Sequence, residues 1–233
     1  MRLFVTHDTP GPHWQLGSPS PELGAFALFG WDCGDRDGGV PERIVNVLAA
    51  GLAASGRVTF ACSAVAAPEA PGWTLLDGDF VTRYRARSMI GRLAARWSAA
   101  APGELVLVST VAERSVARLF DDAGYPWWNQ SQFALVSSAG AAPPDFDRIG
   151  FDPATLLGSG WLDCLHLLAP LGVQAILRPG VDGDVAGLLC GSAEVRERFE
   201  AILSQCAGDG DVALRIVSAE QFGEGLASSP AGD

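Results

Sequence analysis

Short blocks of hydrophobic residues, separated by polar turns rich in glycine and proline, run along the first 138 residues. Blocks rich in β-branched and aromatic residues, which favour strands, cover residues 2–6, 24–31, 58–64, 105–108 and 133–137. Apolar residues at helical spacing predict helices over residues 41–55 and 80–100. Because strands and helices alternate, we expect a mixed, mostly parallel sheet flanked by helices, a fold between the α/β and α+β classes.

The predicted helix over residues 80–100 combines an apolar face with a basic flank. We expect its apolar stripe to pack on the sheet, and the stripe consists of Ala86, Met89, Ile90, Leu93 and Trp97. The basic flank consists of Arg85, Arg92 and Arg96. Guanidinium groups bind carboxylates or phosphates with paired hydrogen bonds, so this flank is a candidate partner-binding surface. The alternative is that its charged heads meet acidic residues of neighbouring elements.

A segment of small residues, 138–144, is the best candidate for a boundary. After it we expect a buried helix over 161–171, a hairpin of strands 173–177 and 185–189, a helix from Ser192 to 206, and a strand over 212–217. This α-β-β-α-β order predicts an α+β lobe over residues 145–222. The lobe would pack on an α/β domain over residues 1–138 or be continuous with it. Residues 223–233 are expected to form a flexible tail.

Charge and composition exclude several functions. All 16 basic residues are arginine, which rules out a lysine Schiff base and the G-x-x-x-x-G-K-[ST] phosphate loop. The net charge of −11 argues against nucleic acid as the main partner and favours a basic protein, whose approach it would steer. The alternative is that the acidity serves solubility alone. The composition, rich in arginine, alanine and glycine, is typical of a bacterial protein from a GC-rich genome.

The sequence also predicts the compartment. No apolar stretch approaches the roughly 20 residues that cross a bilayer, and the N-terminus turns polar after one short run. We therefore expect a cytoplasmic protein without a membrane partner. The five cysteines form no CxxC pair, which favours reduced thiols over a disulfide framework or a structural zinc site.

Histidine and aspartate gather after the first two predicted strands, where sites in α/β proteins often lie. The candidate metal ligands are His7, Asp8, His13, Asp32, Asp35 and Asp37. Imidazole and carboxylate groups could hold a divalent cation with open positions for water, provided that the two loops converge. Their spacing matches neither H-E-x-x-H nor the D-x-[DN]-x-[DN]-G loop. The alternative is an Asp/Gly turn with surface histidines. No other cofactor is evident.

Asp163 and His166 are three residues apart in the predicted helix over 161–171, which places them on one face. A carboxylate beside an imidazole fixes its tautomer and raises its basicity, as a general base requires. The two are therefore candidate catalytic residues, and we expect them to contact each other or nearby backbone in a mostly buried setting. The alternative is a core helix whose polar groups merely satisfy each other.

Two further features could bind a ligand. The predicted helix starts at Ser109-Thr110 and Gly191-Ser192 could each bind an anion through free backbone N–H groups, although capping alone explains both. A turn-like aromatic segment contains Tyr125, Trp127 and Trp128. These side chains would form a binding hot spot if exposed, or close the end of the sheet if buried.

Two functional hypotheses follow. The first is an acidic cytosolic binding protein, a regulator or inhibitor of a basic protein, comparable to an immunity protein. The alternative is a metal-dependent hydrolase or transferase that uses His7, Asp8, His13 and the loop of residues 32–37. Whether the chain is an enzyme is left open by the sequence, and metal analysis and a partner pull-down would distinguish the two hypotheses.

Overall fold

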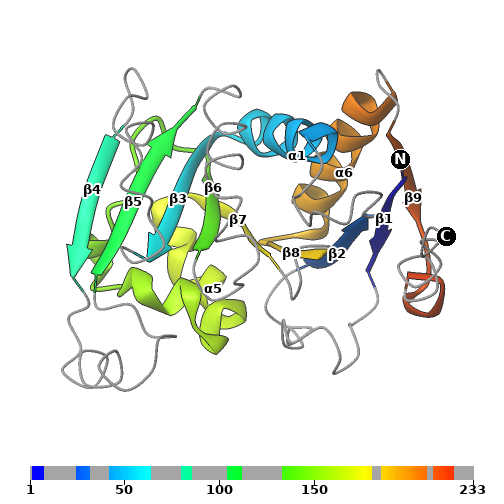
Figure 1. Cartoon of the computed structure of the whole chain (residues 1–233). Coiled ribbons are helices and arrows are strands. Elements are labelled where there is room, and N and C mark those ends of the chain that lie inside the picture. The colour runs from blue at the N-terminus through cyan, green and yellow to red at the C-terminus, as the bar shows by residue number, and fades with distance from the viewer. Residues whose placement is uncertain are drawn as a thin grey trace, which may run out of the picture.

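The computed structural model describes residues 2–7, 25–31, 42–63, 80–85, 104–111, 133–179, 185–208 and 212–222. Nine strands from these segments form one sheet (Figure 1). In chain order they are β1 (Arg2–Thr6), β2 (Ala25–Trp31), β3 (Arg57–Ser63), β4 (Phe80–Arg85), β5 (Glu104–Thr110), β6 (Phe133–Ser138), β7 (Val173–Pro179), β8 (Val185–Cys190) and β9 (Ala213–Ile216). Across the sheet the order is β4-β5-β3-β6-β7-β8-β2-β1-β9.

The expected mixture of sheet and helices is confirmed, but the expectation of a mostly parallel sheet is wrong. Among the described strands, β1 and β9 are parallel, and every other neighbouring pair is antiparallel. A parallel pair needs a crossover of about a dozen or more residues, usually a helix. Residues 180–184 alone connect β7 to β8, which is too short for a crossover, so that connection requires an antiparallel hairpin.

The helix predicted over residues 80–100 is wrong at its start. Residues Phe80–Arg85 form β4, which pairs antiparallel with β5, Phe80 lying opposite Ser109 and Arg85 opposite Glu104. The β-branched and aromatic residues of this segment suit a strand, and pairing with β5 overrides the helical spacing. Residues 86–100, which include the predicted apolar stripe, lie outside the described segments.

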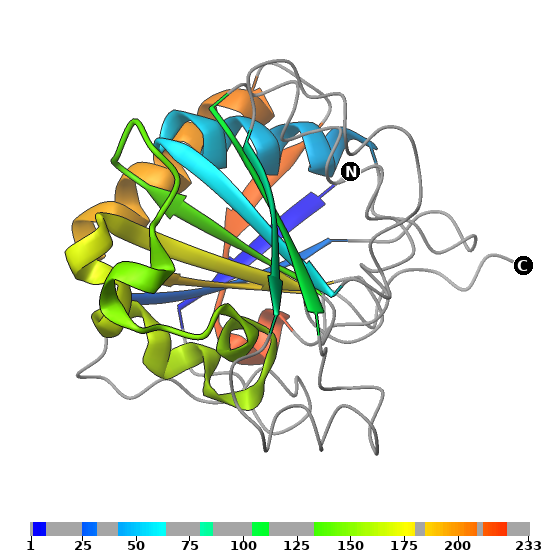
Figure 2. The same ribbon diagram turned by 90° about the vertical axis from the view of Figure 1, so that its left-hand side faces the viewer.

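Two long helices, α1 (Glu42–Ala54) and α6 (Ala193–Gly208), cover one face of the sheet (Figures 1 and 2). Leu48 and Leu52 of α1 share a core with Phe199 and Leu203 of α6 and with strand residues below them. The two helices approach closely at Gly51, where a Cβ would lie 2.9 Å from Cδ2 of Leu203. A glycine at this position therefore lets α1 pack against α6.

Short helical segments cover the opposite face (Figure 2). They are four 3₁₀ helices and a short α-helix, namely η3 (Phe146–Ile149), η4 (Pro153–Leu157), η5 (Ser159–Asp163), α5 (Cys164–Leu168) and η6 (Ala169–Leu171). The helix predicted over 161–171 is thus confirmed as helical, although it is an α-helical turn between two 3₁₀ turns. Trp161, Leu165 and Leu168 are buried against the sheet.

The buried guanidinium of Arg178, on β7, anchors these turns to the sheet. Its Nη1 donates to the carbonyl oxygen of Gly158 at 2.7 Å and its Nη2 to that of Leu157 at 3.1 Å. The guanidinium also lies 5.6 Å from the ring centroid of Trp161. Burial lowers the pKa of Arg178 to about 10, which leaves the group charged at neutral pH. Arg178 therefore has a structural role that its sequence context did not predict.

The C-terminal element order is confirmed. The hairpin of β7 and β8, the helix α6 and the strand β9 follow α5 as expected. Strands from both predicted units belong to the same sheet, because β6 pairs with β7 and β2 pairs with β8. Among the described residues, no helix is long and apolar enough to cross a membrane.

Candidate functional site

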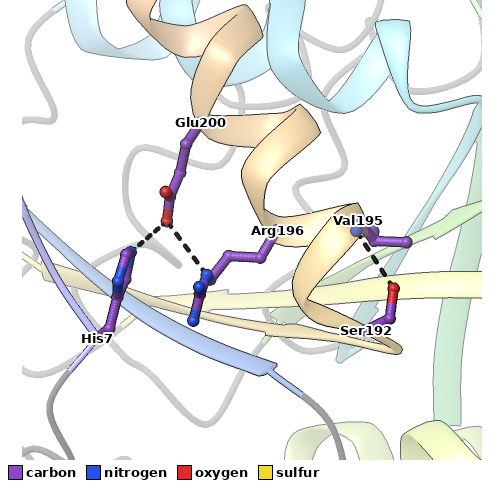
Figure 3. Close-up of polar contacts among 5 residues, drawn as sticks. All are labelled: His7, Ser192, Val195, Arg196 and Glu200. Carbon is purple, nitrogen blue, oxygen red and sulfur yellow. Dashed lines mark hydrogen bonds and ion pairs between the residues drawn. The ribbon is translucent and has the colours of Figure 1, made fainter.

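His7 is the predicted site residue for which the structure shows a direct side-chain partner. It follows β1, and its Nε2 lies 2.7 Å from Oε1 of Glu200 on α6. Leu3 and Val5 face the core beneath α6, and side chains alternate along a strand, so the strand directs His7 toward the same helix. Figure 3 shows the imidazole approaching the carboxylate across the gap between β1 and α6.

Arg196 approaches the same carboxylate oxygen. Its Nε lies 3.8 Å from Oε1 of Glu200, and Arg196 precedes Glu200 by one turn of α6 (Figure 3). The Glu200 side chain is only 8% exposed, whereas that of His7 is 31% exposed. A buried carboxylate is costly unless it is paired and hydrogen-bonded, and these two contacts supply that compensation. We call these three residues the His7–Glu200–Arg196 cluster.

The start of α6 fixes the position of the cluster. Ser192 precedes the helix, and its Oγ accepts a hydrogen bond from the backbone N–H of Val195 at 3.3 Å (Figure 3). The predicted cap at Ser192 is therefore confirmed. Arg196 and Glu200 are four residues apart and so lie on one face of the helix. The other predicted helix start, Ser109-Thr110, lies at the end of β5, and the residues after Val111 are outside the described segments.

The chemistry open to the cluster is limited but definite. A carboxylate that binds one imidazole nitrogen orients the ring and leaves the second nitrogen for a proton or a ligand.

The nearby thiol of Cys190 does not add a nucleophile. Burial, and then the charge of Glu200, raises the pKa of Cys190 to about 12. Burial, and then Asp163, likewise raises the pKa of Cys164 to about 12. Both thiols therefore remain protonated at neutral pH.

The antiparallel pairing of β1 and β2 bears on the predicted metal site. Trp31, the last residue of β2, lies opposite Leu3, four residues before His7. At roughly 3.3 Å per residue, the end of β2 at Trp31 is therefore about 13 Å from His7, measured along the strand direction. Asp8, His13, Asp32, Asp35 and Asp37 lie outside the described segments. Within those segments, no group of three His, Cys, Asp or Glu side chains is placed to hold a metal ion.

The structure places Asp163 and His166 at the surface. Both side chains are exposed, while their neighbours Trp161, Leu162 and Leu165 are buried. The expected buried setting is therefore wrong. The reason is that the apolar residues of this short helical segment face the sheet and leave the polar pair on the solvent side. A catalytic role for Asp163 and His166 stays a prediction.

The candidate partner-binding residues are mostly outside the described segments. These are Tyr125, Trp127, Trp128, Arg92 and Arg96. Arg85 is the last residue of β4, so its backbone is placed beside Glu104, and its side chain is not described.

Sequence reasoning missed Glu200 and Arg196. Their four-residue spacing on α6 is visible in the sequence, but it is a common surface pattern and indicates no partner. His7 and Glu200 are 193 positions apart, so only the pairing of distant strands brings them together.

The chain matches no known protein family, no curated protein and no solved structure.

Proposed function

We propose that this chain is an acidic binding protein whose partner is a basic protein, as a regulator or inhibitor would be. Support comes from the charge of the chain, which carries 27 acidic residues against 16 arginines and has a net charge of −11.

Acidic residues are frequent in three short segments between described elements, 32–41, 180–184 and 209–211. Connecting segments in folded domains commonly carry recognition residues on a rigid support. An acidic surface speeds the encounter with a basic partner and disfavours acidic competitors.

One end of the sheet gives the proposal a location. Arg2 pairs with Ala213, Leu3 with Trp31, Gly30 with Val185, and Pro179 with Ala186. These pairs lie at one end of five neighbouring strands, β9-β1-β2-β8-β7, which we call the Trp31 end. The chain enters or leaves the sheet here next to three acidic connections, 32–41, 180–184 and 209–211. Their acidic residues are Asp32, Asp35, Asp37, Asp182, Asp184, Asp209 and Asp211.

The proposal is tested by capture followed by a matched pair of variants. The tagged full chain is used to capture proteins from a lysate of its native cell, and the recovered partner is purified for titration. Asp182→Asn with Asp184→Asn should raise the dissociation constant about tenfold. The control is Asp163→Asn with Glu197→Gln, which removes the same charge from exposed sites on η5 and α6 and should have little effect. Capture of no reproducible partner, or equal loss in both variants, would contradict the proposal.

The alternative, a metal-dependent hydrolase or transferase, has less support. It requires the loops after β1 and β2 to meet, yet the chain leaves these antiparallel strands at opposite ends. In addition, Nε2 of His7 is bound to Glu200. Metal analysis of the purified chain, with His7→Ala and Asp32→Ala as variants, tests this alternative directly. Stoichiometric metal that both substitutions remove would favour it over the binding protein.

A further inference from the structure

Among the described strands, β9 forms one edge of the sheet and has a row of backbone groups with no described partner. It is the last strand of the sheet, and β1 is its strand partner. The backbone N–H of Val217 donates to the carbonyl oxygen of Val5 at 2.8 Å. Backbone groups of successive residues point to alternate edges of a strand. The N–H and C=O groups of Leu214 and Ile216 therefore point away from β1, and no described residue binds them.

The side chains of β9 are also available. Ile216 is 61% exposed, the largest value among the exposed large hydrophobic residues described, and Leu214 is half-buried against the core beneath α6. Ala213 and Arg215 are exposed on the opposite face. An open edge with apolar side chains is the surface to which an extended peptide adds as an extra strand.

The net charge of the chain indicates which kind of segment would bind at β9. The chain carries −11, so a second copy would be repelled, whereas a basic strand would be attracted. Acidic residues also flank β9 in the sequence, with Asp209 and Asp211 before it and Glu220 and Glu224 after it. Glu220 is described and exposed. We infer that β9 binds an extended, basic segment of a partner protein by strand addition at Leu214 and Ile216. The inference rests on the proposed function, since it names how that partner docks.

The test uses a defined probe and a residue-specific readout. The probe is a labelled peptide of about eight residues, alternating valine and lysine, a length typical of a strand. Its binding to the full chain should slow amide hydrogen exchange at Leu214 and Ile216. A peptide that alternates valine and glutamate should bind at least about tenfold more weakly, because its charge matches that of the chain.

Variants of β9 distinguish backbone pairing from nonspecific binding to exposed apolar side chains. Ile216→Pro removes an outward N–H without removing a bond to β1, which edge strands tolerate, and should weaken peptide binding about tenfold. Arg215→Gln removes a like charge and should strengthen binding about two- to threefold. The control Leu167→Thr alters an equally apolar, exposed residue on α5 and should change nothing.

Three results would overturn the inference. These are exchange protection confined to other strands, equal binding by Ile216→Pro and the parent, and dimers of the free chain that Ile216→Pro dissolves. Failure of the proposed function is a different result. If the peptide fails but capture succeeds and depends on Asp182 and Asp184, strand addition is wrong and the binding function stands. If capture fails while the peptide binds β9, strand addition at β9 is supported and the proposed binding function is wrong.

Discussion

Nε2 of His7 lies 2.7 Å from Oε1 of Glu200, which ties the end of the first strand to the helix α6. The contact holds together two parts of the chain that are 193 residues apart, and it compensates a carboxylate that is nearly removed from water. Its energetic value can be measured by a double-mutant cycle.

In that cycle, His7→Ala should lower the free energy of unfolding by roughly 1–3 kcal/mol, because the buried carboxylate loses its closest partner. Glu200→Gln should also destabilise. The double variant should lose less than the sum of the two, with a coupling of about 1 kcal/mol or more. Urea unfolding of the four proteins gives the numbers. Strict additivity would show that the two side chains do not stabilise each other.

The contact of α1 with α6 predicts a difference between two glycines. Gly51→Ala places a Cβ 2.9 Å from Cδ2 of Leu203, whereas Gly208→Ala meets no atom within 4 Å. Both changes gain helix propensity. Gly51→Ala should therefore be less stable than Gly208→Ala by about 1 kcal/mol or more. Equal unfolding midpoints in urea would mean that the two helices are further apart than described.

The turn that leads from α1 into β3 depends on a glycine in an unusual conformation. Gly56 has a φ of +132°, and a Cβ there would clash with the carbonyl oxygen of Ser138 on β6. Gly56→Ala should cost about 2–4 kcal/mol, combining backbone strain with the clash. Gly150→Ala is the matched control, since its φ is +67° and nothing lies within 4 Å. Thermal unfolding should rank the control well above Gly56→Ala, and the reverse order would contradict the described turn.

The two buried thiols predict a dependence on pH. The pKa values of Cys164 and Cys190 are raised from 9.0 to about 12, so the folded chain retains protons that the unfolded chain loses. Their contribution to stability is therefore fully present below pH 9 and is lost as the pH rises toward about 12. Urea titrations of the parent and of Cys164→Ala with Cys190→Ala should show a weaker decline in the variant over this range.

Alkylation gives a direct check on the same thiols. At pH 8, iodoacetamide should label Cys164 and Cys190 far more slowly in the folded chain than in 8 M urea, because a pKa of about 12 leaves little thiolate. Peptide mapping by mass spectrometry resolves the two sites. Rapid labelling of either cysteine in the folded chain would show that it is accessible and ionised.

Local sequence patterns predicted most of the elements but not how they pair. The apolar blocks located β1, β2, β3, β5 and β6, and the turn residues located the hairpin of β7 and β8. Strand direction depends on contacts between distant segments. No single strand carries a local sequence pattern that indicates its partner, so the pairing of β2 with β8 and of β1 with β9 could not be predicted. Residues 80–85 fit both a helix and a strand, and pairing with β5 decided between them.

The candidate site shows the same limit. His7 was recognised because it follows a strand, but its partner Glu200 could be found only once α6 was placed over β1. Asp163 ends the 3₁₀ helix η5 and His166 lies in the adjoining α5. The prediction that they are buried is wrong, because the sequence does not show which side of a short segment faces the sheet.

The proposed binding function is tested most directly by the salt dependence of association with the captured partner. Stopped-flow rates are measured over a range of sodium chloride concentrations for the parent and for a variant with Asp182, Asp184, Asp209 and Asp211 changed to Asn. Acidic steering predicts that the association rate constant of the parent falls at least about tenfold between low and physiological salt. The same account predicts a much shallower fall in the variant. Equal slopes for the two proteins, or a parent rate that salt does not change, would contradict the proposal that acidic connections at the Trp31 end recruit a basic protein.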